Sequence, residues 1–425
     1  MCKTMKIQAL VFVTLLVCGG LGYYMLTAVF EDRLSLSPTP EQHMMGNRSK
    51  LYSVWHSGNV SKSLARPPVR DYKLIVIWTT WWGMRMTWIN NSTIHGCPSM
   101  PECVLTADHQ EVGNADAVVF HHNSLRKVYS AKLAMPPVRF PHQYWVWWTR
   151  ECPMVTRVVD LVSYSGVFNW TMTYRNDSDV LSRCTGGSTS RVYKKLKETN
   201  ISPDKDYTVG KKYLAVWFVS NCYKYLPRFA YGMELMKHIS VDVFGKCGRA
   251  VCAKKDFDCS NGIIKQYKFY LSFESYKCKE YITEKFWRNA IGNDVVPVVL
   301  GAVKTEYERF VPPGSFIHVN DFETPKALAD YLKILDKDKE MYHQYFRWRT
   351  QPPKSAFPED YDGMCNLCRK LQQVGPTERK VYTDLDRWWR GEDYEFCEPI
   401  VLVENAYGDP RNLVRLHKEV ITSLV

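Results

Sequence analysis

Residues 280–293, EYITEKFWRNAIGN, carry charged side chains in a pattern that could bind an anion. Thr283 is a suitable N-cap for a helix that Gly292 and Asn293 can end. Lys285 lies in the expected first turn, where the free N–H groups make a cation unfavourable unless an anion is close by. A helix N-terminus and a lysine at the end of a strand could together bind a diphosphate. A lysine side chain extended over a solvated first turn accounts for the same residues equally well.

Several short apolar runs predict the β-strands that would position such a site. Apolar runs of this length, separated by stretches long enough for helices, are typical of buried parallel strands. Residues 269–300 read as one β-α-β unit around the expected helix, and residues 228–239 can form another helix. We therefore expect an α/β protein with two doubly wound, Rossmann-like domains facing a cleft, and ligands at the carboxyl ends of the strands. The predicted strands are 73–78, 117–120, 144–148, 213–219, 241–244, 269–273 and 295–300.

Residues 7–30 form a run of 24 residues without a charge, which is long enough to cross a bilayer. No A-x-A type cleavage site follows, and this favours a retained signal-anchor over a cleaved signal peptide. Lys3 and Lys6 place the short N-terminal side in the cytoplasm and the remainder of the chain in a lumen. Residues 31–70 are rich in Ser, Pro and Asn and are expected to form a stem.

Two further features fit a lumenal location. Twelve of the 14 cysteines follow the apolar segment, an even number that favours disulfides, with free buried thiols or a metal cluster as the alternatives. Cys365 and Cys368 alone suggest half of a zinc site, but no second Cys or His pair completes it. The sequons, which are candidate glycosylation sites, stand at Asn47, Asn59, Asn90, Asn91, Asn169, Asn176 and Asn200.

The formal net charge of +12 favours anionic partners. No dense Lys/Arg run interleaved with aromatic residues and no zinc-finger or RNA-binding signature occurs, so we expect no nucleic-acid partner. A phosphorylated small molecule fits the charge as well. Hydrophobic residues make up 45% of the chain, which excludes a largely disordered protein.

One long block resembles a known enzyme family. The segment KFYLSFESYKCKEYITEKFWRNAIGNDVVPVVLGA is similar to the signature of the α1,3-fucosyltransferases, glycosyltransferase family 10. Further matching blocks follow the family's order from about residue 72 to 372, among them CVLTADHQEVGNADAVVFHH, WVWWTRECP, FNWTMTYRNDSDV and VWFVSNC. The resemblance implies a type II Golgi membrane enzyme of the GT-B architecture. The expected segments are a cytoplasmic tail 1–6, a transmembrane signal-anchor 7–30, a stem 31–70, an acceptor-side α/β domain 71–205, a GDP-fucose-binding α/β domain 206–350 and a cysteine-containing extension 351–425.

The resemblance also implies a catalytic base. Inverting transfer from GDP-β-L-fucose needs a group that takes the proton of a sugar hydroxyl. In the family this group is a glutamate in a segment similar to TRECP, which here is Glu151. A lone Glu after a strand could otherwise be a surface carboxylate. Partial burial among Trp145, Trp147 and Trp148 is expected to raise the pKa of Glu151 into a useful range.

The leaving diphosphate requires cations and N–H donors. The resemblance places these on Arg228 and Lys285, and it implies acceptor recognition for His121 and His122. Neighbours on a strand point to opposite faces, so the two histidines do not suggest a metal pair. Core packing is the alternative for the tyrosines below, and an internal salt bridge is the alternative for the arginine. The other donor-site residues implied are Glu284, Tyr281, Tyr174, Arg175, Ser220 and Asn221.

No metal ligand set is expected. Asp177 and Asp179 form an Asp-x-Asp pattern that resembles the metal-holding motif of some nucleotide-sugar enzymes. GT-B enzymes generally neutralise the diphosphate with protein cations, so the resemblance implies no obligatory cofactor and leaves stimulation by Mn²⁺ or Mg²⁺ open. Ser275 and Asn176 depart from the family pattern, which often has Asn and a basic residue there; neither departure removes a group assigned to the bond-changing step.

The acceptor is less sharply indicated. The segments FGKCGRAVCAKKDFDC and DLDRWWRGEDYEFC resemble invertebrate enzymes that fucosylate the innermost GlcNAc of N-glycans, whereas TYRNDSDV leans towards Lewis-type enzymes that act on antennae. We favour the core acceptor and keep the antennal one as the alternative. Two rival classes are a membrane-anchored glycan-binding protein without activity and a glycosidase with two catalytic carboxylates. A binding protein has no reason to keep both a base and a diphosphate site.

Overall fold

The computed structural model describes residues 70–81, 86, 92–93, 103–125, 135–157, 159–183, 202, 204–253, 256–310, 312–350, 363–375, 378 and 380–398, and two strands within 401–415. The expected membrane segment 7–30 and nearly all of the expected stem lie outside these residues. Among the described helices, none has the length and hydropathy needed to span a bilayer. The sequons at Asn47, Asn59, Asn90, Asn91 and Asn200 also lie outside.

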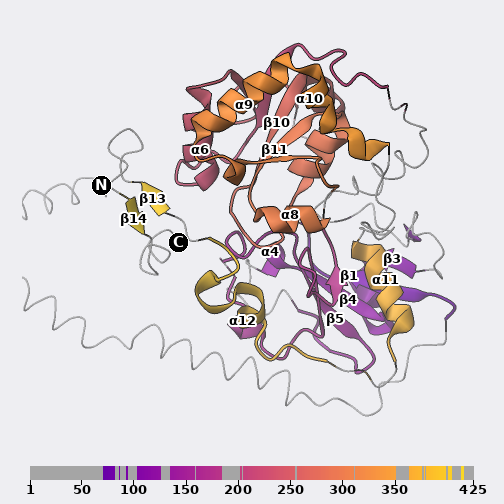
Figure 1. The fold of residues 1–425 in the computed structure, drawn as a ribbon. Coiled ribbons are helices and arrows are strands. Elements are labelled where there is room, and N and C mark those ends of the chain that lie inside the picture. Colours follow the sequence, from indigo (N-terminus) through magenta and orange to yellow (C-terminus); the bar gives the residue numbers. More distant parts are fainter. Residues whose placement is uncertain are drawn as a thin grey trace, which may run out of the picture. The chain divides into compact units, whose positions relative to one another are not determined.

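The N-terminal part of the described chain forms a seven-stranded sheet with the order β2-β3-β1-β4-β5-β6-β7 (Figure 1). Every neighbouring pair is parallel except β2 and β3. The three strands predicted in this region are confirmed, and four were missed, of which β2 and β7 have only two residues each. The strands are β1 Lys73–Ile77, β2 Ser92–Thr93, β3 Cys103–Thr106, β4 Ala117–His121, β5 Tyr144–Trp148, β6 Trp170–Thr173 and β7 Val180–Leu181.

The following residues form a second, five-stranded sheet with the order β12-β11-β10-β8-β9, in which every pair is parallel. The four strands predicted here are confirmed. The strands are β8 Tyr213–Phe218, β9 Val241–Phe244, β10 Tyr267–Phe273, β11 Val296–Leu300 and β12 Ile317–His318. The α-helices of this region are α6 Pro227–Met236, α7 Phe257–Ile264, α8 Lys304–Phe310, α9 Pro325–Lys337 and α10 Lys339–Gln344.

Each sheet reverses its strand order at one point. In the first sheet the reversal lies between β1 and β4, and in the second it lies between β8 and β10. Parallel sheets open a crevice beyond the carboxyl ends of the strands at such a point. The residues that follow β8 and β10 are therefore the first place to look for a ligand site.

Burial on both faces explains why the strands read as continuous apolar runs. All five residues of β5 are buried, as are all five of β11. Helices α6 and α9 cover one face of the second sheet through Leu235, Leu328 and Leu332. A strand covered on both sides has no polar face, so its sequence does not alternate.

The helix expected over residues 283–293 is present but is not an α-helix. Residues Lys285–Ala290 form a π-helix, η3, and Ile291–Asn293 continue it as a 3-10 turn, η4, that ends at Asp294 in the left-handed conformation with φ 55°. The Thr283 hydroxyl is at most a weak N-cap. It donates to Glu274 Oε1 at 2.7 Å, and the Lys285 N–H lies a long 3.5 Å from it.

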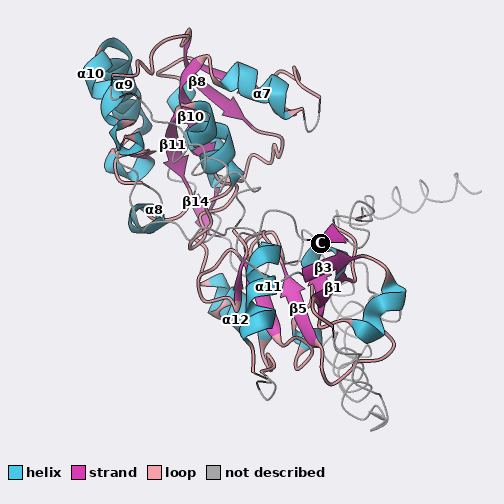
Figure 2. Ribbon diagram, turned by 90° about the vertical axis from the view of Figure 1, so that its right-hand side faces the viewer, coloured by secondary structure: helices cyan, strands magenta, loops and turns pink. Residues whose placement is uncertain are grey.

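The C-terminal helices pack on the first sheet, although they follow the second sheet in the sequence. Helix α11, Gly363–Gln373, inserts Leu367 and Leu371 into the core of the first sheet, and helix α12, Leu385–Arg390, lies in the same region (Figure 2). The expected extension 351–425 therefore contributes to the first domain. The other elements are α4 His122–Leu125, the 3-10 helices η1 His109–Asn114, η2 Val162–Tyr164, η5 Val319–Asp321, η6 Arg347–Arg349 and η7 Glu392–Tyr394, and the antiparallel pair β13 Val401–Val403 and β14 Leu413–Arg415.

Disulfides use most of the described cysteines. Cys365 is disulfide-bonded and Cys368 pairs with Cys103, so this CxxC pair is not half of a zinc site. Cys152 is a free, buried thiol, which was the alternative to disulfide use for these cysteines. The remaining bonds join Cys222 with Cys247, Cys252 with Cys259, and Cys278 with Cys397.

Candidate active site

Glu151 lies three residues beyond the end of β5, at the carboxyl edge of the first sheet. The Tyr281 hydroxyl donates to Glu151 Oε2 at 2.9 Å, and the Glu151 N–H donates to the Thr149 hydroxyl at 3.2 Å. Burial raises the pKa of the Glu151 carboxyl, while the Tyr281 hydrogen bond and the charge of Lys285 oppose that shift. The residue as a whole is of intermediate exposure. These properties suit a general base.

Lys285 faces a buried carboxylate. Its Nζ lies 3.0 Å from Glu274 Oε2, 2.9 Å from the Thr283 hydroxyl and 3.4 Å from Glu284 Oε1. The side chain of Lys285 keeps 18% of its surface exposed, whereas Glu274 is completely buried. An internal counter-charge therefore explains how a cation is tolerated at this position.

Glu274 was not singled out from the sequence. It is the first residue after β10, at the point where the strand order of the second sheet reverses. Its Oε1 accepts from both the N–H and the hydroxyl of Thr283, and burial raises the pKa of its carboxyl although Lys285 opposes this. A Cβ at Gly301 would come within 2.9 Å of its Cγ, so a glycine makes room for it. The signal that could have identified Glu274 was its position directly after a buried strand, next to the place where the strand order of the sheet reverses.

Glu284 remains ionised although it is partly buried. Burial alone would raise its pKa, but the charges of Lys285 and Arg288 outweigh that effect and lower it. The charges of Glu284, Glu274 and Lys285 all act on the pKa of Glu151. The structure thus brings the predicted base near three of the predicted donor-site residues, Tyr281, Glu284 and Lys285.

Arg228 is the second residue of α6 and is only 4% exposed. Its Nη2 donates to the Asn221 carbonyl at 2.7 Å, which ties it to the exposed loop Ser220–Asn221 after β8. Its Nε is buried and has no hydrogen-bond partner among the described residues. Because a buried guanidinium is costly without acceptors, this arrangement fits a site that receives an anion. The Cys222–Cys247 disulfide holds the same loop to the turn after β9.

Tyr174 is fully buried and packs its ring against Tyr281, with 5.2 Å between ring centroids. Its hydroxyl has no hydrogen-bond partner among the described residues. The packing supports the core role that was the alternative for this residue, and it restricts the ring of Tyr281. A direct contact of either tyrosine with a donor stays a prediction.

Arg175 turns towards the C-terminal residues. Its Nη1 donates to the carbonyls of Trp388 and Trp389 at 3.0 and 3.1 Å, and its guanidinium lies 4.1 Å from the ring centroid of Phe396. It also pairs with Asp177. These contacts match the internal role that was the alternative for Arg175. A donor-binding role stays a prediction, which none of the described contacts supports.

The two predicted acceptor-side histidines are both buried. Burial and Arg150 lower the pKa of His121 to about 4, and burial is the main cause that lowers the pKa of His122 to about 3. Both rings are therefore neutral near pH 7. The Nε2 of His122 contacts the Thr156 carbonyl at 3.0 Å, which indicates a packing role for this ring. Acceptor recognition by His121 stays a prediction.

The Asp-x-Asp carboxylates are engaged inside the protein. Asp177 pairs with Arg175, and Asp179 accepts from Thr171, Lys380 and Tyr382. Neither carboxylate is directed towards Glu151 by these contacts. The structure therefore offers an internal explanation for the motif.

Two predicted glycosylation candidates are hydrogen-bonded through the nitrogen that a glycan would need. Asn169 is 2% exposed and its Nδ2 donates to the Lys380 carbonyl at 2.9 Å. Glycosylation of Asn169 stays a prediction, which these contacts do not support. Asn176 is exposed, but its Nδ2 donates to Glu280 Oε1 at 3.3 Å and its Oδ1 accepts from Arg183.

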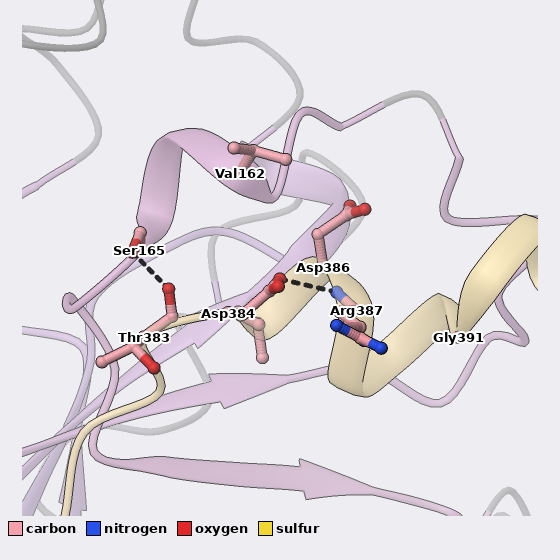
Figure 3. A pocket seen from close by; sticks show the side chains of 8 residues that line it. Val162, Ser165, Thr383, Asp384, Asp386, Arg387 and Gly391 are labelled. Carbon is pink, nitrogen blue, oxygen red and sulfur yellow. Dashed lines mark hydrogen bonds between the residues drawn. The ribbon is translucent and has the colours of Figure 1, made fainter.

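A cavity of about 330 Å³ lies away from these residues, between η2 and α12 (Figure 3). Val162 and Ser165 line one side, and Asp384, Asp386 and Arg387 line the other. Ser165 donates to the Thr383 carbonyl across it, and Asp384 accepts from the Arg387 N–H. None of the predicted catalytic or donor-site residues lines this cavity, and we assign no reaction to it.

Two family models match the chain. The model described as glycosyltransferase family 10 (fucosyltransferase) C-term matches residues 208–388, and the model described as fucosyltransferase, N-terminal, matches residues 70–184. The N-terminal match spans the first sheet, and the C-terminal match spans the second sheet.

Curated relatives show similarity over most of the chain. Glycoprotein 3-alpha-L-fucosyltransferase A of Drosophila melanogaster is 36% identical over 301 residues, covering 69% of this chain but only 56% of that enzyme. The 4-galactosyl-N-acetylglucosaminide 3-alpha-L-fucosyltransferase FUT5 of Hylobates lar is 37% identical over 306 residues, covering 72% of this chain and 77% of that enzyme. A crystal structure of an α1,3-fucosyltransferase with GDP-fucose has a TM-score of 0.50 at 16% identity, covers 79% of this chain and 98% of its own, and indicates a shared fold.

Proposed function

The chain belongs to the fucosyltransferases of glycosyltransferase family 10, and from that premise we propose that it transfers L-fucose from GDP-β-L-fucose in α1,3 linkage to a GlcNAc of glycoprotein N-glycans. The names of the similar proteins support both the donor and the glycan acceptor. The observation that carries the proposal is the group of residues around Glu151. The Tyr281 hydroxyl, from the loop after β10, donates to Glu151 Oε2, and the charges of Lys285, Glu284 and Glu274 act on the pKa of this carboxyl.

In the proposed reaction the acceptor oxygen attacks the anomeric carbon of fucose from the face opposite GDP. Glu151 takes the proton of the attacking hydroxyl, the bond between the anomeric carbon and the β-phosphate oxygen breaks, and GDP leaves with the bonding electrons. The raised pKa of Glu151 makes it a stronger base than an ordinary surface carboxylate. A single displacement of this kind inverts the anomeric configuration.

Arg228 and Lys285 would receive the diphosphate. Arg228 brings a buried Nε that no described residue uses, and the partly exposed Lys285 brings a positioned ammonium. Positioned charges of this kind stabilise a departing anion more than mobile ones, because they need no reorganisation. The N–H of Thr283 already donates to Glu274, so the backbone of this turn contributes less than the sequence pattern suggested.

The same proposal extends to cofactors and location. We propose that protein cations meet the charge of GDP without an obligatory metal, and we leave stimulation by Mn²⁺ or Mg²⁺ open. The engagement of Asp177 and Asp179 within the protein supports this view. We further propose a single-pass type II protein of the Golgi membrane with its catalytic part in the lumen, on the strength of the apolar segment 7–30 and its flanking lysines.

The acceptor is proposed to be the innermost, core GlcNAc. The sequence around Cys247, Cys252 and Cys259 and the tail that ends at Cys397 support this choice, and antennal GlcNAc is the alternative. To test this choice, the full-length protein in detergent is supplied with GDP-fucose and two acceptors, a core glycopeptide and an N-acetyllactosamine antenna. The linkage formed on each acceptor is then mapped. Product on the core alone supports the choice, whereas product on the antenna alone overturns it.

The same experiment separates the rival classes. A glycan-binding protein without activity would bind an acceptor but release no GDP. A glycosidase would release sugar without any nucleotide. Release of GDP that depends on the acceptor, with an α1,3 product, excludes both.

A further inference from the structure

The loop that carries Tyr281 is bound to the C-terminal residues 388–398, which we call the C-terminal segment. Cys278 forms a disulfide with Cys397, and the two residues also form an antiparallel bridge. On either side of it the Lys279 N–H donates to the Phe396 carbonyl at 2.7 Å and the Glu398 N–H donates to the Lys277 carbonyl at 2.8 Å. The loop is thus joined to this segment covalently and by backbone hydrogen bonds.

The C-terminal segment is in turn fixed to the domain that carries Glu151. Arg175 donates to the carbonyls of Trp388 and Trp389 and lies over the ring of Phe396. Trp389 Nε1 donates to the Thr156 hydroxyl at 2.8 Å. Thr156 follows Glu151 by only five residues, so the segment is anchored close to the proposed base.

A second connection holds the same loop from the side of Glu280. Its carboxylate accepts from the backbone N–H of Asn176 at 2.7 Å, and its own N–H donates to Glu306 Oε2 at 2.8 Å. The backbone of Glu280 has φ 59°, a left-handed conformation that costs a non-glycine residue energy and persists only when neighbours enforce it. This enforced conformation sets the direction in which Tyr281 leaves the backbone.

We propose that the C-terminal segment and its disulfide to Cys278 act as a positioning element that holds the Tyr281 hydroxyl against Glu151 and so fixes the orientation of this carboxylate. The inference rests on the proposed function, because it assumes that Glu151 is the base. Tyr281 and the cystine are positioning residues, and neither takes part in a bond-changing step. The match to the C-terminal family model ends at residue 388, so Cys397 lies beyond the matched region, whereas its partner Cys278 lies within it.

The hydrogen bond has a measurable consequence. Tyr281 stabilises the ionised form of Glu151, so its loss raises the pKa of the carboxyl and leaves the base protonated up to a higher pH. In a plot of kcat against pH, the rise on the acidic side should then move to higher pH; we call this part of the profile the acidic limb. The other charged groups that act on Glu151 are Lys285, Glu284 and Glu274, which all variants below retain.

Cys152 requires attention in the design of the variants. Its sulfur lies within 4.8 Å of both sulfurs of the Cys278–Cys397 cystine. Loss of Cys397 alone would leave Cys278 next to this thiol, where a lumenal oxidant could join them. The variant therefore replaces both members as C278A/C397A, and peptide mapping without reduction verifies that Cys152 stays free.

The experiment compares Y281F, C278A/C397A and their combination with the unaltered full-length protein. C252A/C259A is the matched control, because it removes a disulfide whose loop has no described contact with Glu151 or Tyr281. Fucose transfer is measured as kcat against pH, and GDP affinity is measured by calorimetry. We expect Y281F and C278A/C397A to move the acidic limb in the same direction, with kcat on that limb reduced by about tenfold and GDP affinity within twofold. The control should follow the unaltered protein.

The combined variant distinguishes positioning from general damage. If the cystine acts through Tyr281, the combination should reduce kcat no further than Y281F does, because coupled residues are not additive. Additive losses would overturn the proposal, as would an unshifted limb in Y281F. Y281F removes a single oxygen, so an unshifted limb in this variant overturns the proposal even if C278A/C397A does not fold. Absence of transfer by the unaltered protein would instead reject the proposed function.

Discussion

Lys285 Nζ lies 3.0 Å from Oε2 of Glu274, whose carboxylate is completely buried. This pair answers why a lysine stands in the first turn of a helix, where the macrodipole disfavours it. The carboxylate offsets the positive charge while no donor is bound. Lys285 remains exposed enough to meet a second anion, so the pair can hold the ammonium in place for a diphosphate.

Glu151→Gln tests the proposed base. The amide retains the shape of the side chain and its contact with Tyr281 but cannot take a proton. Fucose transfer should fall by about 100-fold or more, while GDP affinity stays nearly unchanged, because the proposed diphosphate contacts are assigned to other residues. Steady-state transfer and GDP calorimetry provide the two measurements. Retained turnover would reject Glu151 as the base.

Lys285→Ala tests the anion site. Loss of a charge-assisted hydrogen bond to phosphate should weaken GDP binding by about 10- to 100-fold, measured by calorimetry. Lys333→Ala is the matched control, since Lys333 pairs with Asp330 on the exposed side of α9. Unchanged GDP affinity in Lys285→Ala would contradict the assignment of this residue to the diphosphate.

Glu274→Gln separates the charge of the buried carboxylate from its hydrogen bonds. Removing one negative charge beside Lys285 should leave GDP affinity undiminished or raise it by about threefold, because the remaining potential is more positive. Weaker GDP binding would instead show that the carboxylate is needed to place Lys285.

Glu274→Gln should also change how the free energy of unfolding depends on pH. Burial raises the pKa of Glu274 in the folded protein above its value of 4.5 in the unfolded chain, so the folded state binds the proton more tightly. Its contribution is most favourable below pH 4.5 and declines as pH rises through the raised value. Melting curves from pH 4 to 8 should show Glu274→Gln gaining stability relative to the unaltered protein. The opposite trend would mean that the ion pair with Lys285 dominates.

Arg175→Leu distinguishes two roles for this arginine. If it anchors the C-terminal segment, the variant should lose about 3 kcal/mol of stability, because two carbonyl acceptors and the contact with Phe396 go unmet, while GDP affinity is retained. Arg249→Leu, which breaks an exposed pair with Asp242, is the control. Chemical denaturation and GDP calorimetry supply the data. Weaker GDP binding with unaltered stability would restore the donor-site role.

Local sequence patterns were sufficient to predict most of the longer strands of the two sheets. The runs at Tyr144–Trp148 and Val241–Phe244 became strands over the same residues. β5 is buried along its whole length, and its apolar run is visible without any knowledge of its neighbours, whereas β9 at the sheet edge is only partly buried. The two-residue strands β2, β7 and β12 have no such run, and their pairing comes from the sheet around them.

The two-sheet α/β frame could be predicted from local apolar patterns, and family resemblance indicated the set of residues available for acid–base and anion chemistry. The tertiary structure alone decided which partners those residues meet. Lys285 faces Glu274, Arg175 faces the C-terminal segment, and Cys278 pairs with a cysteine 119 residues away. Helical and strand periodicities report only whether a residue is buried. A pairing between distant residues depends on how whole elements pack, and no local pattern encodes it.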